Sequence, residues 1–194
     1  QYHITNNTFD NNTFISKNSI AIEFVGWSYN TMFTNNNVTS ETNTAFFNNG
    51  HDGGTFINNT FTGGDIGIYV SGATDTTFIR NKVMGSTVGT RILGSSNNTF
   101  LYHTSTGNTG IYFYRNSNDN LFQDCINISG DSHVYFRSNE NNKNNIFLNC
   151  TYNLSKETVN EGNNSLIRQW WLDANVTNST GSPVAGALVS AYNN

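Results

Sequence analysis

The stretch Asn97-Asn98-Thr99-Phe100 is one copy of a phrase that recurs along most of this sequence. Related phrases occupy 11–14, 30–33, 54–56, 76–78, 119–122 and 144–147. Their phenylalanines, at 14, 33, 56, 78, 100, 122 and 147, follow one another at steps of 19, 23, 22, 22, 22 and 25 residues. A period near 22 is too long for a helical turn and too short for a domain. It indicates one supersecondary unit stacked on copies of itself.

A second regularity lies midway between the phenylalanines. Short segments such as 67–70 and 110–113 alternate apolar and polar residues, which is typical of strands with one buried face. The equivalent inward residues recur at steps of 24, 22, 22, 21 and 23: Ile22, Phe46, Ile68, Thr90, Ile111 and Val134. Asn, Gly, Ser and Asp clusters between these segments favour turns, and no window has sustained helical periodicity. The chain is predicted to be all-β.

Each coil of about 22 residues would then hold two or three short strands, stacked into parallel sheets about 4.8 Å apart. The phenylalanines from Phe33 to Phe147 form one predicted internal ladder, and the inward residues above form a second. Corner asparagines can hydrogen-bond the neighbouring backbone and the asparagine one rung above. Residues 1–13 are interpreted as the tail of an earlier coil, because Phe9 precedes Phe14 too closely for a full turn.

The phrase at 110–113, followed by 116–122, resembles the parallel β-helix repeat. It is similar to the repeat of NosD-type copper-processing accessory proteins, of pectate-lyase-like proteins, and of many archaeal and bacterial surface proteins. The resemblance covers about residues 1–155 and implies a right-handed parallel β-helix of roughly six to seven coils. The same repeat serves lyases, epimerases, adhesins and surface coats, so it implies the fold more closely than the function.

The rhythm stops after Tyr152, which divides the chain into a β-helix at 1–155, a linker or cap at 156–169 and a strand extension at 170–194. Residues 181–192 resemble the opening strands of an Ig-like, carboxypeptidase-regulatory-type sandwich, but about 25 residues are too few for one. They would be either a truncated domain or strands added to a neighbouring sheet. Trp170 and Trp171 are expected to cap the last coil.

Composition excludes some classes of partner. A net charge of −4 argues against nucleic acid, which needs a basic stripe. Charged residues make up only 11% of the chain, yet 36 asparagines supply polarity and no apolar run is long enough to enter a membrane. The absence of a methionine start suggests a processed or excised piece.

Eleven asparagines begin Asn-x-Ser/Thr sequons, which accept glycans in secreted proteins. They are Asn6, Asn11, Asn37, Asn58, Asn97, Asn127, Asn149, Asn153, Asn163, Asn175 and Asn178. The alternative is that an Asn- and Thr-rich repeat generates sequons by chance.

Two cysteines occupy equivalent positions of the repeat. Cys125 and Cys150 each follow a phenylalanine by three residues, so they should lie on adjacent rungs within the separation that a disulfide tolerates. An extracellular bridge here would tie the last coils together. The alternative is two buried thiols on a ladder whose earlier members are Asn36, Asn59, Asn81 and His103.

The outward side chains of the alternating strands form a predicted column that is rich in aromatic residues and arginine. Such a surface suits stacking on sugars or packing against another protein. The alternative is an ordinary cross-rung stack that stabilises the sheet. The predicted recognition face consists of Phe47, Tyr69, Arg91, Tyr112, Tyr114, Tyr135 and Arg137.

No catalytic residue or metal ligand is predicted. The acidic residues Asp65, Asp75, Asp119, Asp124 and Asp131 are scattered through corners rather than paired. The histidines His3, His51, His103 and His133 occupy unrelated phases of the repeat, so the copper role of NosD-type proteins does not transfer. No cofactor is expected, although a calcium ion in an Asp/Asn-rich corner stays open.

These features predict a non-enzymatic extracellular structural protein, an archaeal glycoprotein of the cell surface. Its partners would be copies of itself, in a sheath, filament or S-layer-like coat, or neighbouring surface proteins. The alternative is a carbohydrate-binding or carbohydrate-active module, lyase- or hydrolase-like, that uses the recognition face.

Overall fold

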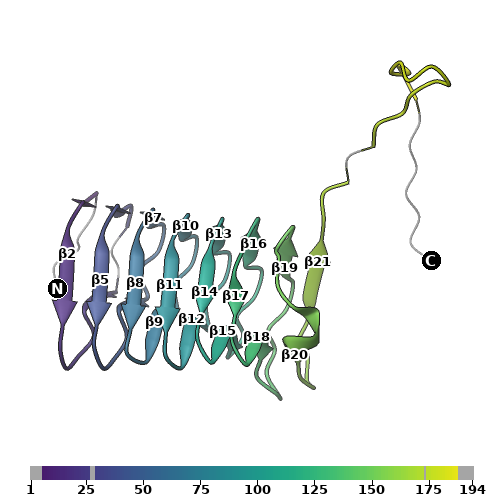
Figure 1. The fold of residues 1–194 in the computed structure, drawn as a ribbon. Helices are drawn as coiled ribbons and strands as arrows, with labels where there is room; N and C mark the ends of the chain where they lie inside the picture. Colours follow the sequence, from purple (N-terminus) through teal and green to yellow (C-terminus); the bar gives the residue numbers. More distant parts are fainter. Residues whose placement is uncertain (1–5, 27–28, 173, 188–194) are drawn as a thin grey trace.

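The computed structural model describes residues 6–26, 29–172 and 174–187, and these form a parallel β-solenoid with a C-terminal tail (Figure 1). In each of the first six coils the chain runs through three short strands, and equivalent strands of neighbouring coils pair in parallel. The coils number about seven, with about 22 residues in each. The all-β solenoid predicted from the period is confirmed.

Three sheets result, called the first, second and third sheet in the order in which a coil meets them. The first sheet contains β1 (Thr8–Asp10), β4 (Met32–Thr34), β7 (Thr55–Ile57), β10 (Thr77–Ile79), β13 (Thr99–Leu101), β16 (Leu121–Gln123), β19 (Asn145–Leu148) and β21 (Leu166–Gln169). The second sheet contains β2 (Thr13–Ser16), β5 (Asn37–Ser40), β8 (Thr60–Gly63), β11 (Lys82–Gly85), β14 (Thr104–Thr106) and β17 (Ile128–Ser129). The third sheet contains β3 (Ile22–Val25), β6 (Phe46–Asn49), β9 (Ile66–Ser71), β12 (Val88–Leu93), β15 (Thr109–Tyr114), β18 (Ser132–Phe136) and β20 (Glu157–Val159).

A ladder of buried phenylalanines runs through the first sheet, as predicted. The rings of Phe78 and Phe100 lie 4.7 Å apart and nearly parallel, and those of Phe100 and Phe122 lie 4.3 Å apart. Burying each such side chain stabilises the fold by about 1.5–3 kcal/mol. The interpretation of residues 1–13 as the tail of an earlier coil is wrong, because Phe9 pairs with Phe33 in the first sheet, whereas Phe14 lies in the second sheet. Residues 8–26 therefore make a regular coil of their own.

Left-handed backbone conformations turn the chain at both ends of the first-sheet strands from β1 to β19. Asparagine and aspartate adopt this region most readily among residues with a side chain, which explains their recurrence there. The position before the strand holds Asn6, Asn30, Gly53, Asp75, Asn97, Asp119 and Asn144. The position after it, called the corner column below, holds Asn11, Asn35, Asn58, Arg80, Tyr102, Asp124 and Asn149.

The asparagines next to these corners point inward and form hydrogen-bonded ladders. Asn59 donates from Nδ2 to the carbonyl of Phe33 at 2.8 Å, and its Oδ1 accepts from the backbone N–H of Asn36 at 2.8 Å. Asn81 repeats both bonds one rung later, with the carbonyl of Phe56 and the N–H of Asn59. Each amide thus satisfies backbone groups that a turn would otherwise leave unpaired. Similar ladders join Asn98, Asn120 and Asn145, and Asn142 and Asn164.

The solenoid continues beyond the expected boundary at residue 155. The segment 156–169, expected as a linker or cap, supplies β20, which pairs with β18, and β21, which pairs with β19. A 3₁₀ helix at Leu154–Lys156 precedes β20. None of the helices in the part of the chain that the structure describes is long and apolar enough to cross a membrane.

Trp170 and Trp171 do not cap the last coil, because each is 59% exposed on the segment that leaves β21 (Figure 1). Tyr152 and Leu166 pack against the end of the core instead. In the tail, Thr177 and Pro183 form an antiparallel bridge. The resemblance to an Ig-like segment falls partly on residues 188–194, which lie outside the described residues.

The asparagine ladder yields a stability prediction. Asn59→Ala leaves the carbonyl of Phe33 and the N–H of Asn36 buried without partners, at about 1–3 kcal/mol for each group. Urea denaturation followed by circular dichroism should therefore show a loss of about 2–5 kcal/mol in the free energy of unfolding. The matched control, Asn58→Gly at the exposed neighbouring corner, should change it by less than about 1 kcal/mol. Equal effects of the two substitutions would contradict the role given to the ladder.

Candidate functional site

The recognition face predicted from the sequence lies on the outer side of the third sheet. The strand register places Phe47 beside Tyr69, Tyr69 beside Arg91, and Arg91 beside Tyr112. Tyr135 follows Tyr112 on the next rung. The side chains of all these residues are half-buried, because each packs against its neighbours along the column.

One guanidinium, that of Arg91, lies among the aromatic rings of this column. The rings of Phe47 and Tyr69 stack at 4.7 Å. The guanidinium carbon of Arg91 lies 5.4 Å from the ring centre of Tyr69 and 5.3 Å from that of Tyr112, which places the cation between two aromatic rings. The Nε of Arg91 is buried and has no hydrogen-bond partner. Burial also raises the pKa of Tyr112, whose phenol therefore stays neutral.

A second group of the same kind lies beside the column. Tyr114 stacks parallel to Tyr112 at 6.3 Å, and the guanidinium carbons of Arg137 and Arg115 lie 4.3 Å and 5.0 Å from its ring centre. Among the described residues the one ion pair joins Arg168 to Glu157, elsewhere in the solenoid. The arginines of the recognition face thus have no carboxylate partner in that part of the chain, and the face is locally positive on a chain of net charge −4.

Arg115 was missed from the sequence, although the repeat contained a signal for it. Its backbone has a φ of 52°, in the left-handed region. The equivalent positions in earlier coils are glycines with positive φ: Gly26, Gly50, Gly72 and Gly94. An arginine at a position where the repeat otherwise uses glycine is conformationally unfavourable, and such residues cluster at functional sites.

Two of the acidic residues considered for catalysis, Asp119 and Asp124, accept hydrogen bonds at corners of the coil. Asp119 accepts a hydrogen bond from Asn144 at 3.0 Å. Asp124 accepts bonds from Asn149 at 2.6 Å and from Gln123 at 3.1 Å, and these bonds lower its pKa. No group of three or more His, Cys, Asp and Glu residues that could hold a metal ion occurs within residues 6–26, 29–172 and 174–187.

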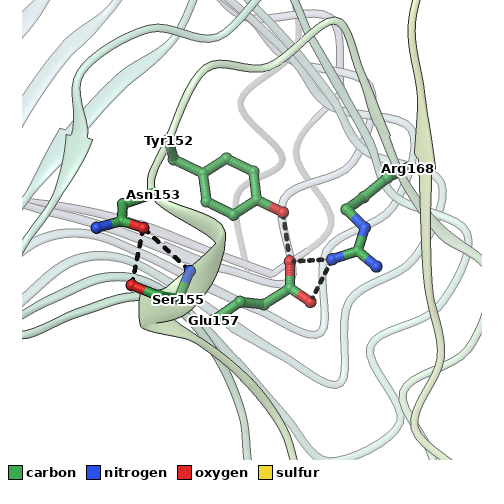
Figure 2. Close-up of polar contacts among 5 residues, drawn as sticks. All are labelled: Tyr152, Asn153, Ser155, Glu157 and Arg168. Atoms are coloured by element: carbon green, nitrogen blue, oxygen red, sulfur yellow. Dashed lines mark hydrogen bonds and ion pairs between the residues drawn. The ribbon is translucent and has the colours of Figure 1, made fainter.

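A carboxylate, a phenol and a guanidinium do converge in the last coil (Figure 2). Glu157 accepts a hydrogen bond from the hydroxyl of Tyr152 at 2.5 Å and pairs with Nη1 of Arg168 at 3.0 Å. The ring of Tyr152 meets that of Phe147 edge-on at 5.7 Å. Burial and the Glu157 carboxylate together raise the pKa of Tyr152 well above its ordinary value. Each of these polar groups is satisfied by another, so the cluster closes the end of the core.

The sequence of the chain was compared with models of known protein families. The model of the right-handed β-helix region matches residues 22–180, most of the chain. The chain belongs to the right-handed β-helix family. This match confirms the handedness that the repeat resemblance implied, and it fits a cell-surface or carbohydrate-active β-helix module. The comparisons with curated proteins and with solved structures gave no match.

Two histidines lie inside this β-helix. His103 is fully buried, its Nε2 lies 2.9 Å from Oγ1 of Thr90, and its Nδ1 has no partner. Burial lowers the pKa of His103 to about 3, so the side chain is neutral at ordinary pH. His51 is also buried, with its Nε2 3.0 Å from Oγ1 of Thr31, and burial lowers its pKa too. Both histidines therefore serve the polar interior rather than a surface site.

Cys125 and Cys150 lie on the rung positions that the sequence predicted, but the expected disulfide is not present: both are free thiols. Each sulfur points to the carbonyl of the rung below, Cys125 to Phe100 at 3.6 Å and Cys150 to Phe122 at 3.3 Å. The inward amides of Asn59 and Asn81 bond equivalent carbonyls in earlier coils. The thiols thus continue the asparagine ladder, which was the alternative interpretation.

All eleven sequon asparagines are exposed. In the phrase at 97–99, for example, Asn97 is exposed, Asn98 is buried and the outward Thr99 follows. A corner asparagine and the threonine two residues later both face outward, so the repeat itself generates sequons. The geometry leaves every one of these asparagines accessible to glycosylation, which stays a prediction.

The buried imidazole yields a prediction of pH dependence. Because the folded pKa of His103 lies near 3, below the unfolded value of about 6.5, the unfolded chain binds a proton more readily as the pH falls through this window. Stability should therefore fall with acidification, with a contribution from His103 of about 1.4 kcal/mol per pH unit. In His103→Asn, the residue type of earlier rungs, that slope should be smaller by this amount between pH 6 and 4. Denaturation midpoints at several pH values test this, and parallel slopes would contradict it.

The thiols yield a prediction of reactivity. Burial and the neighbouring Cys150 raise the pKa of Cys125 well above its ordinary value, and a protonated thiol is a poor nucleophile. Iodoacetamide should label the half-buried Cys150 first and Cys125 only after unfolding, as read by peptide mass spectrometry. If neither thiol is labelled in denaturant until a reductant is added, the two form a disulfide and the free-thiol assignment is wrong.

Proposed function

We propose that this chain is an extracellular, non-catalytic glycan-binding module of the right-handed β-helix family. The recognition face on the third sheet would hold a polysaccharide chain along the axis of the solenoid. The observation that carries the proposal is the guanidinium of Arg91, 5.4 Å and 5.3 Å from the two tyrosine rings, with a buried Nε that lacks a protein partner.

The chemistry of this face suits sugars. The stacked tyrosine and phenylalanine rings offer their outer edges as apolar contacts for pyranose rings, and phenol and guanidinium groups donate hydrogen bonds to hydroxyl and carboxylate oxygens. Because parallel strands pack about 4.8 Å apart, successive rungs repeat at close to the length of one sugar unit in an extended chain. The five rungs from Phe47 to Tyr135 span about 19 Å on that spacing. A polymer with several units can therefore engage the whole column.

The assignment as a binding module rather than an enzyme is supported by the carboxylates. Asp119 and Asp124 are held by amides at corners, and Glu157 is neutralised by Arg168. Glycoside hydrolysis requires two carboxyl groups that flank one bond, and polysaccharide lyases require a free base beside the sugar. The residues that line the recognition face are aromatic or cationic instead.

An extracellular location agrees with the eleven exposed sequon asparagines. Assembly of copies into a sheath, filament or S-layer-like coat, expected from the sequence, stays a prediction. Electron microscopy of the purified protein tests it, because regular tubes or fibres would support assembly and discrete particles would contradict it.

Replacing Arg91 and Tyr112, the central residues of the recognition face, tests whether this face binds polysaccharide. A screen of immobilised polysaccharides first identifies one that the unchanged protein binds. The double variant Arg91→Ala/Tyr112→Ala should bind this polysaccharide at least about tenfold more weakly, because hydrogen bonds to charged groups contribute about 1.5–3 kcal/mol each. Isothermal titration calorimetry measures the affinity, and circular dichroism checks the fold.

The matched control is Trp170→Ala, which removes an exposed aromatic side chain outside the face. It should leave the affinity unchanged. Retained binding in the folded double variant, or no binding of the unchanged protein to any polysaccharide, would overturn the proposal.

A further inference from the structure

The repeat provides an internal standard for each position, and the corner column departs from it at two adjacent rungs. This column holds asparagine at four of its seven positions and aspartate at one, but Arg80 and Tyr102 at the other two. Both residues adopt a φ of 52°, in the left-handed region that their side chains disfavour. The guanidinium carbon of Arg80 lies 5.0 Å from the ring centre of Tyr102. Because asparagine occupies this corner without that cost, the pair is unexplained by the fold.

The second sheet departs from its own pattern on the same rungs. Lys82 pairs with Thr60 on one side and Thr104 on the other, and Met84 pairs with Thr62 and Thr106. The two outward threonine columns are thus interrupted by a cation and a thioether in a single coil.

These four departures line one cavity. It has a volume of about 350 Å³, and Thr104, Thr106 and Asn127 line it as well. The volume lies at the lower end of the range for small-molecule sites. The fold of the coil requires none of these four departures from the repeat. Because all four surround one cavity, they indicate a binding site.

We propose that this cavity binds one anionic sugar unit, carboxylated or sulfated, of a polysaccharide. Arg80 and Lys82 supply two positive charges, and neither is paired with a carboxylate within the described residues. Tyr102 is 46% exposed and presents its ring as a stacking platform. The hydroxyls of Thr104 and Thr106 and the amide of Asn127 provide neutral hydrogen-bonding groups of the kind that sugar hydroxyls require.

The nearest carboxylate in the corner column does not neutralise this site. Asp124 follows Tyr102 by one rung, and its two oxygens accept bonds from Asn149 and Gln123. It is absent from the lining of the cavity. Arg80 and Lys82 are both exposed, so they can turn toward a carboxylate or sulfate that enters.

This site goes beyond the proposed function, because it lies on the second sheet and its corner, whereas the recognition face lies on the third sheet. Its selectivity for charge would come from Arg80 and Lys82, which lie outside that face. Neither site requires the other.

The test uses three trisaccharides with one backbone that differ only at C6: cellotriose, its C6-oxidised glucuronic acid form and its C6-sulfated form. Calorimetry with the unchanged protein should show binding of one or both charged forms, weakened at high salt, and at least about tenfold weaker binding of cellotriose. The carboxylated and sulfated forms identify which anion the cavity prefers.

The deciding variant is Arg80→Asn/Lys82→Thr, which restores the residues of the neighbouring coils. It should lose at least about tenfold in affinity for the charged trisaccharide. It should also unfold at an equal or higher denaturant concentration, because asparagine relieves the left-handed strain. Tyr102→Asn should weaken binding of the same ligand in the same way.

Arg91→Ala/Tyr112→Ala separates the two sites, since it should leave the part of the trisaccharide binding that depends on Arg80 and Lys82 in place. Equal affinity for cellotriose and the charged forms, or full binding by folded Arg80→Asn/Lys82→Thr, would overturn this inference without affecting the recognition face. Loss of the charged trisaccharide only in the Arg91 variant would likewise overturn it and assign the binding to the third sheet.

Discussion

The structure depends on the ladder of inward asparagine amides that joins each coil to the next. The side-chain amides of Asn36, Asn59 and Asn81 each accept from an N–H and donate to a carbonyl of the preceding rung. The stacked rings from Phe56 to Phe122 fill the space beside them. Parallel strands of three or four residues would slip easily, because they make few hydrogen bonds each. A buried amide prevents such a slip because its hydrogen bonds form in a single register. Any shift of the strand leaves polar groups unpaired in the interior.

A fixed register has a consequence for function. Outward side chains line up in columns at the rung spacing, and they can change from coil to coil without disturbing the core. Most outward positions of the second sheet keep threonine or asparagine. Departures from the repeat at other outward positions gather in the middle coils, where Arg91 lies between two tyrosines, Arg115 replaces a glycine, and Arg80 and Tyr102 replace asparagine. The positive charge of the chain is thereby concentrated on two outer surfaces while the net charge stays negative.

The sequence predicted the period, the all-β class, the inward ladder from Ile22 to Val134 and the whole aromatic column, because the 22-residue spacing reports equivalent rungs directly. Its errors arose where the spacing changes. The phrase that ends at Phe14 resembles the first-sheet phrases. However, Phe9 pairs with Phe33, and Asn36 donates to the carbonyl of Phe9, so Phe9 is the residue in the first sheet. The strands of the last rung, β20 and β21, were not predicted because they lack the phenylalanine phrase. The cavity beside Arg80 could not be predicted from the sequence. Its residues come from two adjacent coils, and only the strand register of the folded chain shows that they lie side by side.

A crystal structure of the protein grown with the C6-oxidised trisaccharide is the most direct test of the central claim that binding sites lie where outward residues depart from the repeat. The account predicts sugar rings against the rungs of Arg80 and Tyr102, along the column around Arg91, or at both. Sugar bound instead to the regular threonine and asparagine rungs, such as those of Thr39 and Thr62, would contradict it.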